Sequence, residues 1–311
     1  MRPRALAVTG PTTSGKTALS VEIARALHAE IISMDSRQIY TGMDIGTDKV
    51  RPEERGGIPH YGLDLVPPEA AFSAGQWARL ARAWIDEIEA RQHVPMLVGG
   101  TGFFLRALTH PMFREPELDE QRRDALRSWL LARSRDELEA WVRRVDPARA
   151  ETAIAGGPQR LTRTLEVALL SGRRLSEWHR QGEADAPGTA CLVVVLDMER
   201  DELDRRIDAR VSAMMERGFL DEVRDLLHKG YDEKAPGMTG TGYREMTRVI
   251  RGEMSVDEAL FEMRRQTRQY ARRQLTWFRN QLPDALRLDA LAPRARLVEQ
   301  VCEAWQQAVA S

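Results

Sequence analysis

The octapeptide Gly10-Pro-Thr-Thr-Ser-Gly-Lys-Thr17 constrains the fold of this 311-residue chain more than any other segment, because it fits the pattern G-x-x-x-x-G-K-[ST]. It follows the apolar run Ala5–Val8 and precedes a segment whose apolar residues recur at helical spacing. A strand, a glycine-rich turn and a helix in this order form a phosphate-binding loop. The alternative is a strand-to-helix turn without a ligand, but the complete octapeptide in this context favours a phosphate site.

The residue types of this loop suit the binding of a phosphorylated ligand. Small residues let backbone N–H groups and the positive N-terminus of the helix surround phosphate oxygens. Lys16 is expected to neutralise a terminal phosphate, and Thr17 is the expected ligand of Mg²⁺, the only metal that we expect. The loop suits a diphosphate as well as a nucleotide triphosphate such as ATP. The predicted phosphate-binding residues are Gly10, Thr12, Thr13, Ser14, Gly15, Lys16 and Thr17.

The rest of the chain alternates short apolar runs with helical segments, which is the pattern of β-α-β units around a parallel sheet. The fold class predicted is therefore α/β, with a P-loop NTPase-like parallel sheet core flanked by helices. The expected strands are Ala5–Val8, Ile31–Met34, Met96–Val98 and Cys191–Leu196. The expected helices of this core include Trp77–Glu89, Arg200–Met215, Leu220–Leu227, Ser255–Gln281 and Pro293–Val309.

One long segment departs from this pattern and predicts a second domain. From about Arg114 to about Asp185 no strand pattern occurs, and the sequence indicates amphipathic helices such as Leu118–Ala132 and Arg135–Val145. Breakers mark its edges, with Pro111 and Pro116 on one side and Pro187 and Gly188 on the other. We therefore predict a catalytic core made of residues 1–113 and 187–311, and an all-helical insertion domain, residues 114–186.

Polar segments follow the second and third predicted strands. Because ligands of doubly wound sheets bind at the carboxyl ends of the strands, we expect both segments near the phosphate loop. Asp35 ends one strand and is a candidate general base or magnesium partner, with a plain turn residue as the alternative. Gly99-Gly-Thr-Gly102 follows the other strand and allows close backbone approach. A small-molecule kinase with a helical lid fits these features equally well.

The overall composition excludes few partners but does indicate a compartment. The formal net charge of −1 and the pI near 6.6 give no global reason to expect a nucleic acid or an acidic membrane. The two cysteines are too few for a disulfide framework, and no apolar run approaches the length of a membrane span. We expect a cytoplasmic protein. Arginine supplies nearly all of the positive charge, and the four lysines are Lys16, Lys49, Lys229 and Lys234.

Beyond the phosphate loop, short blocks of distinctive sequence run along most of the chain. They are Asp35-Ser-Arg-Gln-Ile-Tyr40, Gly42-Met-Asp-Ile-Gly-Thr47, Gly99-Gly-Thr-Gly102, Pro158-Gln-Arg-Leu161, Leu165-Glu-Val167, Gly242-Tyr-Arg-Glu245, Arg268-Gln-Tyr-Ala-Arg-Arg-Gln274 and Trp277-Phe278. In this order, and together with the loop, they resemble the tRNA dimethylallyltransferase family, P-loop enzymes that prenylate the adenosine next to the anticodon. One departure is Phe103-Phe104, where the family usually has an aliphatic residue and a tyrosine.

The resemblance implies a reaction and a set of partners. The loop and Mg²⁺ would hold dimethylallyl diphosphate, and the acceptor would be N6 of the adenosine 3′ of the anticodon (position 37) in the anticodon stem-loop. Asp35 is the implied general base, with Lys16 and Thr17 assisting at the diphosphate; a monomer is expected. The implied tRNA contacts are Asp35, Ser36, Arg37, Gln38, Thr101, Arg123, Gln159, Arg160, Leu161, Thr162, Arg163, Gly242, Tyr243 and Arg244.

Two groups of arginines are further candidates for binding phosphates. Arg206 and Arg210 lie one helical turn apart, and the resemblance implies that arginines of this helix reach the diphosphate; which of the two does so stays open, and a solvated helix face is the alternative. Between Met263 and Arg279 there are six arginines and no acidic residue. Three of them recur every four residues and predict a face for RNA, with pairing to acidic side chains of another element as the alternative. Tyr270, Trp277 and Phe278 are expected mainly in the core, although each could stack on a base.

Four functions stay open at this point: a magnesium-dependent tRNA prenyltransferase, a relative that prenylates free adenine nucleotides, a P-loop kinase, and an RNA-binding ATPase without transfer activity. The helical insertion and the arginine-rich stretch favour the first, because a free nucleotide needs neither.

Overall fold

The computed structural model describes residues 2–111, 116, 118–181 and 186–310. The chain divides into two compact units, Met1–His110 with Gly188–Ser311, and Pro111–Pro187. This division lies close to the predicted boundaries at 113/114 and 186/187. Arg114, the expected first residue of the insertion, lies outside the described residues, as does Asp185 near its expected end.

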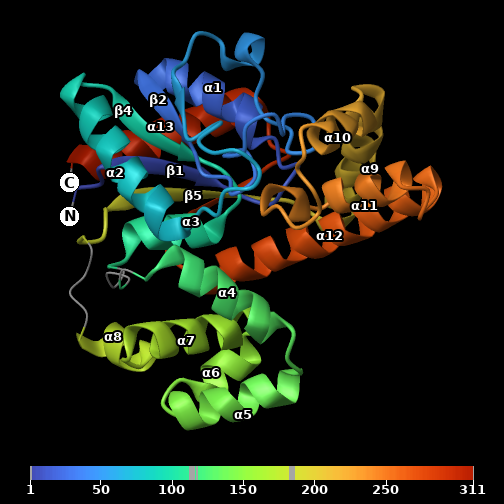
Figure 1. Cartoon of the computed structure of the whole chain (residues 1–311). Coiled ribbons are helices and arrows are strands. Elements are labelled where there is room, and N and C mark those ends of the chain that lie inside the picture. Colours follow the sequence, from blue (N-terminus) through green and yellow to red (C-terminus); the bar gives the residue numbers. More distant parts are fainter. Residues whose placement is uncertain (1, 112–115, 117, 182–185, 311) are drawn as a thin grey trace. The chain divides into compact units, whose positions relative to one another are not determined.

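The first unit is built on a six-stranded parallel sheet with the strand order β3-β2-β4-β1-β5-β6 (Figure 1). The strands are β1 (Ala5–Thr9), β2 (Ala29–Ser33), β3 (His60–Tyr61), β4 (Val94–Val98), β5 (Cys191–Asp197) and β6 (Leu286–Asp289). The four predicted strands are confirmed and occupy the centre of the sheet, where β1 and β2 are buried along their whole length. The two short strands at the edges were not predicted.

Helices cover the sheet and supply the rest of the core. They are α1 (Lys16–Leu27), α2 (Ala74–Ala90), α3 (Gly102–Thr109), α9 (Arg200–Glu216), α10 (Phe219–His228), α11 (Tyr243–Ile250), α12 (Val256–Gln281) and α13 (Arg294–Ala310). Ile23 of α1 and Trp305 of α13 belong to one apolar cluster with side chains of β1, β4 and β5. In α2, the buried Trp77 donates its indole N–H to the Ser33 carbonyl of β2 and stacks on Phe104 of α3. These helices fix the ends of β1, β2 and β4, where the polar loops emerge.

The described residues of the second unit form helices and no strand, in agreement with the predicted all-helical insertion. It contains α4 (Glu120–Leu131), α5 (Arg135–Val145), α6 (Ala150–Ala155), α7 (Pro158–Ser171) and α8 (Leu175–Gln181). Leu130, Val142 and Leu161 lie in its own apolar core. Buried Glu166 accepts two hydrogen bonds from the guanidinium of Arg127, at 2.7 and 2.9 Å. This arrangement satisfies a carboxylate that would otherwise be costly to bury.

No helix in the described ranges is both long enough and apolar enough to cross a lipid bilayer. The 26-residue α12 has the length but carries the arginine-rich stretch.

Candidate active site

The predicted phosphate loop joins β1 to α1 and has an unusual backbone. Gly10, Thr13 and Gly15 have positive φ angles of 153°, 65° and 83°. A Cβ atom on Gly10 would lie 2.7 Å from the Leu196 carbonyl oxygen of β5, so only glycine fits against the neighbouring strand. The loop therefore turns tightly, and α1 begins at Lys16 with its first N–H groups available to a ligand.

Lys16 closes back over this loop. Its Nζ donates to the carbonyl oxygens of Gly10 and Pro11, at 3.0 and 2.6 Å, and lies 3.3 Å from Ser14 Oγ. Burial of the ammonium group lowers the pKa of Lys16 to about 7, whereas the negative charge of Asp35 acts in the opposite direction. The hydrogen-bond partners of the ammonium group are carbonyl and hydroxyl oxygens rather than carboxylates. Its positive charge is therefore available to an anionic ligand.

The loop lines a cavity of about 870 Å³ that lies within the first unit. Arg210 of α9 reaches the loop directly by donating to Thr12 Oγ1. Arg206 also lines the cavity, close to Gly15, and pairs with Glu202 at 2.7 Å. The predicted pair is therefore at the phosphate loop, and Arg210 is the one bonded to it. The acidic neighbour of Arg206 is Glu202, and that of Arg210 is Asp48, whose carboxylate lies 3.7 Å from the guanidinium.

Asp35 lies at the carboxyl end of β2 and lines the same cavity. Its Oδ1 accepts the Arg37 backbone N–H at 2.8 Å, which is the turn geometry expected from the plain alternative. The two interpretations are compatible, because a carboxylate has two oxygens and only Oδ1 is needed for the turn. The turn fixes the direction of the carboxylate toward the cavity that holds Lys16.

The segments after β2 and β4 are bonded to each other. The Ser36 backbone N–H donates to Thr101 Oγ1 at 3.0 Å, and the hydroxyls of the two residues are 3.4 Å apart. A Cβ atom on Gly99 would lie 2.1 Å from the Met34 carbonyl oxygen, so the glycine permits this close approach. Thr101 is thereby placed beside Asp35, as expected from the parallel sheet.

Two residues of α12 complete the site. Nothing in the sequence around them indicates the residues that they contact. Buried Gln274 accepts the Thr12 backbone N–H at 2.9 Å and donates to the Gly100 carbonyl at 2.8 Å. It joins the phosphate loop to the end of β4. The Tyr270 ring is partly exposed in the cavity, and its hydroxyl bonds to Thr101. Burial of the hydroxyl and the negative charge of Asp35 raise the pKa of Tyr270 to about 12.

The other two aromatic residues of this stretch pack against protein. Phe278 is buried, and Trp277 lies against Gly102 so closely that a Cβ atom there would be 2.3 Å from the indole. Phe104, where the family usually has tyrosine, is also buried against Trp77.

Several predicted tRNA contacts of the first unit bond to the protein itself. Arg37 donates to the Pro236 carbonyl at 3.0 Å, and Gln38 donates to the Asp48 carbonyl at 3.2 Å; both still line the cavity. Gly242 and Tyr243 are buried, and the Tyr243 hydroxyl donates to Glu222 at 2.7 Å. The Tyr243 side chain thus holds protein elements together while lining the cavity, and its contact with tRNA stays a prediction. Arg244 is exposed.

The predicted contacts of the helical unit lie on α4 and α7. Gln159 and Arg160 are exposed, and Arg123 and Arg163 are half-buried. Leu161 and Thr162 are buried; Leu161 lies in the core of this unit, and the Thr162 hydroxyl donates to the Pro158 carbonyl at 3.0 Å. Packing and the helix backbone occupy these two side chains, and their contact with tRNA stays a prediction.

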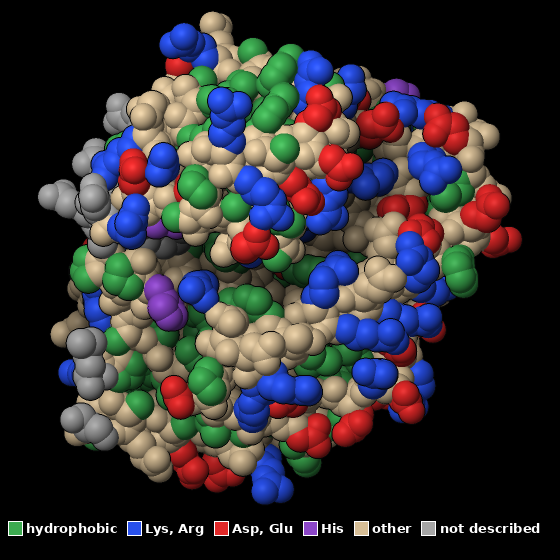
Figure 2. Space-filling model, turned by 90° about the horizontal axis from the view of Figure 1, so that it is seen from below, with side chains coloured by type: hydrophobic (Ala, Val, Ile, Leu, Met, Phe, Trp, Pro, Cys, Tyr) green, Lys and Arg blue, Asp and Glu red, His purple; other side chains and the backbone are tan. Residues whose placement is uncertain are grey.

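The arginine-rich stretch also differs from its preferred interpretation. Arg268 donates to both carboxylate oxygens of Asp208 at 2.6 Å, Arg272 pairs with Asp204 at 3.2 Å, and Arg264 lies 3.9 Å from Asp208. The repeated arginines of α12 therefore face acidic side chains of α9, which was the alternative. Figure 2 shows a similar mixture on one face of the molecule, where basic side chains are interspersed with acidic ones.

The donors around the phosphate loop fit a magnesium ion that is held mainly by phosphate oxygens. Among the described residues, no three His, Cys, Asp or Glu side chains are grouped to hold a metal. The Thr17 hydroxyl lies in the first turn of α1 and lines the cavity. Mg²⁺ commonly takes one or two protein oxygens, with the remaining positions filled by phosphate and water.

Comparisons with known proteins support one family. The family model for IPP transferase matches residues 38–281, and that for isopentenyl transferase matches residues 3–61. A tRNA dimethylallyltransferase of Syntrophobacter fumaroxidans is 44% identical over 88% of this chain and 80% of its own length. One of Solibacter usitatus is 42% identical over 89% of this chain and 90% of its own.

Solved structures agree. The tRNA isopentenylpyrophosphate transferase of Bacillus halodurans is 32% identical, with a TM-score of 0.70 over 98% of this chain and 97% of its own. A eukaryotic dimethylallyltransferase studied acting on tRNA is 25% identical, with a TM-score of 0.78 over 98% of this chain and 77% of its own.

Proposed function

The chain belongs to the IPP transferase family, and we propose that it transfers the dimethylallyl group of dimethylallyl diphosphate to N6 of the adenosine 3′ of the anticodon in tRNA. The observation that carries this proposal is the meeting of three charged side chains in one cavity. Lys16 and Arg210 offer positive charge at the phosphate loop, and Asp35 offers a carboxylate at the end of β2.

The diphosphate would be the leaving group, held by the N–H groups of the phosphate loop, Lys16 and Arg210. As the bond between the allylic carbon and the diphosphate oxygen breaks, its electron pair stays on that oxygen. These groups stabilise the developing charge, since they are fixed before the reaction by the loop backbone and by α9. Mg²⁺ held by the Thr17 hydroxyl and the phosphates would supply further electrostatic stabilisation.

The adenine N6 would be the nucleophile. Its lone pair is delocalised into the ring, so the amine is weak until a base accepts a proton. We assign this role to Asp35, which takes the N6 proton as the new N–C bond forms. The turn to Arg37 fixes the carboxylate. Beside it, the bonded pair Ser36 and Thr101 provides polar groups for the adenine ring.

The adenosine must leave its stack to reach the cavity, and this costs less in a loop than in a duplex. The exposed part of the Tyr270 ring lies in the cavity, so we assign it a stacking contact with the acceptor base. Gln159 and Arg160 of the helical unit are the exposed candidates for contacts to the anticodon stem-loop. A tRNA substrate also fits the cytoplasmic location and the monomer expected from the sequence.

The direct test incubates the protein with Mg²⁺, isotope-labelled dimethylallyl diphosphate and unmodified tRNA, and analyses the nucleosides by mass spectrometry. We expect labelled N6-(dimethylallyl)adenosine, with AMP in excess competing poorly. Efficient modification of AMP would point to the free-nucleotide prenyltransferase, and hydrolysis of ATP without base modification would point to the kinase or ATPase. Absence of transfer, while a relative is active in parallel, would refute the proposal.

A further inference from the structure

The chain between β2 and η1 (Pro52–Arg55) contains a loop, residues 41–49, that contributes to the wall of the diphosphate cavity. Arg210, the proposed diphosphate contact, is held from this loop. Its guanidinium lies 3.5 Å from the Thr47 carbonyl oxygen and 3.7 Å from the Asp48 carboxylate. Asp48 also pairs at 3.0 Å with Arg217, the residue that follows α9. The position of the 41–49 loop therefore determines where Arg210 is held relative to Thr12.

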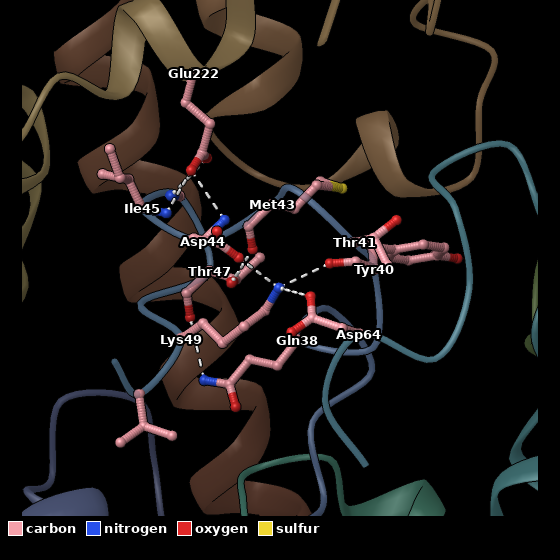
Figure 3. Close-up of polar contacts among 12 residues, drawn as sticks. Gln38, Tyr40, Thr41, Met43, Asp44, Ile45, Thr47, Lys49, Asp64 and Glu222 are labelled. Atoms are coloured by element: carbon pink, nitrogen blue, oxygen red, sulfur yellow. Dashed lines mark hydrogen bonds and ion pairs between the residues drawn. The ribbon is translucent and has the colours of Figure 1, made fainter. Parts of the chain in front are cut away.

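Glu222 of α10 binds the backbone of this loop (Figure 3). One carboxylate oxygen accepts the N–H groups of Asp44 and Ile45, at 2.9 and 2.6 Å, and the other accepts that of Gly46 at 3.1 Å. The Tyr243 hydroxyl donates to the same carboxylate at 2.7 Å. Three consecutive N–H groups that converge in this way form an anion-binding nest, and here a side chain of the protein fills it.

The surroundings of Glu222 keep its donor hydroxyl protonated and the loop backbone close to its carboxylate. Burial and the Glu222 charge raise the pKa of Tyr243 well above 10, so the hydroxyl stays a donor at physiological pH. A Cβ atom on Gly46 would lie 2.3 Å from the Phe219 ring and 2.6 Å from the Tyr243 ring. The loop backbone thus lies directly on the rings, within reach of the carboxylate.

Buried Lys49 fastens the other end of the loop. Its Nζ donates to the Tyr40 carbonyl at 2.8 Å and to the carboxylates of Asp44 and Asp64, each at 2.6 Å (Figure 3). The loop is therefore fixed by two groups. The Glu222 carboxylate binds its backbone N–H groups, and the Lys49 ammonium group binds a carbonyl and two carboxylates. Neither residue lies among those that line the cavity.

We propose that Glu222 is a positioning residue for diphosphate binding, which acts through the 41–49 loop on Arg210. The path runs from the Glu222 carboxylate to the N–H groups of residues 44–46, through the loop backbone to the Thr47 carbonyl and Asp48, and from these to the guanidinium that reaches Thr12. This inference rests on the proposed function, because it takes Arg210 as a ligand of the diphosphate.

The test is Glu222→Gln, with inorganic diphosphate and Mg²⁺ titrated into the intact protein by calorimetry. An amide has one acceptor oxygen where the carboxylate has two, and its NH₂ group faces loop N–H groups, so the nest cannot be satisfied. We expect the Kd for diphosphate to rise about tenfold, the loss of about one charge-assisted hydrogen bond to the anion. The KM for dimethylallyl diphosphate rises with it, and kcat falls because Arg210 also stabilises the leaving group, while the Kd for tRNA stays within about twofold.

The matched control is Asp221→Asn, the same kind of change at the exposed neighbour of Glu222 on α10, and it should bind diphosphate like the wild type. Tyr243→Phe removes one donor hydroxyl and keeps the carboxylate; it should give a smaller loss, and it decides the matter if Glu222→Gln does not fold. General destabilisation would lower the active fraction and kcat but leave the Kd unchanged. Diphosphate binding within twofold of wild type in the folded variants would overturn the inference. A wild-type protein that binds no diphosphate would instead overturn the proposed function.

Discussion

The protonation of Lys16 leads to a quantitative prediction about diphosphate binding. In the free protein the pKa of Lys16 is about 7, because its ammonium group is desolvated among the carbonyls of the loop. A bound diphosphate restores negative charge beside it and favours the protonated form. At pH 8, one unit above this pKa, only about a tenth of the free protein carries the proton, so binding takes up ~0.9 proton at Lys16.

The affinity for diphosphate should therefore fall about tenfold between pH 6 and pH 8, beyond the change caused by titration of the ligand itself. Calorimetry in buffers of different ionisation enthalpy measures the proton uptake directly. Lys16→Arg is the control, because a guanidinium stays charged throughout and takes up no proton at this position. Equal proton uptake by the wild type and by Lys16→Arg at pH 8 would refute the reasoning.

The lowered pKa of Lys16 also affects stability, which should rise with pH while the affinity for diphosphate falls. The unfolded chain has a lysine pKa near 10.5, so between about pH 7 and 10.5 it binds more protons at this position than the folded chain does. The contribution of Lys16 to the free energy of unfolding therefore increases with pH across that window, and its full penalty is present below pH 7. Diphosphate should relieve this penalty, and the increase in Tm on adding diphosphate should be larger at pH 6 than at pH 8.5.

Two other perturbations test how α12 supports the site. Gln274→Leu leaves the Thr12 N–H and the Gly100 carbonyl without their partner, and it should lower the free energy of unfolding by about 2–4 kcal/mol in urea and weaken diphosphate binding; a loss below 1 kcal/mol would contradict the contacts. Arg268→Gln breaks a partly exposed pair with Asp208, and we expect a loss of only ~0.2–1 kcal/mol. Because Arg268 is already paired, the variant should keep the wild-type slope of log K for tRNA binding against log salt concentration. A slope smaller by about one would show that Arg268 contacts an RNA phosphate.

The central sheet and the phosphate loop could be predicted because their signals are local. Ala5–Val8 is an unbroken apolar run that leads into a motif whose glycines the backbone requires. The edge strands β3 and β6 were missed because they have two and four residues and gain their pairing from a neighbour already in place. Helix α3 was missed because it begins with the glycine of a turn motif.

The site was predictable to the extent that its residues end strands or belong to motifs. Gln274 lies 262 residues from Thr12 and 174 from Gly100 along the chain, and Glu222 lies at least 176 residues from the loop that it binds. No sequence pattern around either residue indicates those partners. Lys49 did carry a signal, because it is one of four lysines in a chain that otherwise uses arginine. Its buried ammonium group bonds to three oxygens, so its position, like that of Lys16, has a structural reason.

The arginines of α12 show the limit of charge patterns. The repeat of Arg264, Arg268 and Arg272 within Met263–Arg279, a stretch without acidic residues, indicates an anionic partner but does not identify it. In the fold, Asp204 and Asp208 of α9 are spaced one turn apart and supply that partner. The near-zero net charge of the chain reflects such pairs.

The account depends most directly on Asp35 as the base that accepts the N6 proton. The decisive measurement is the single-turnover rate of prenyl transfer by Asp35→Asn, with diphosphate and tRNA affinities measured on the same preparation. An asparagine keeps the turn to Arg37 but cannot accept the proton, so the rate should fall by roughly 10²–10⁴ while both affinities stay within a few fold. A rate within tenfold of the wild type, with both substrates bound, would contradict the role of Asp35.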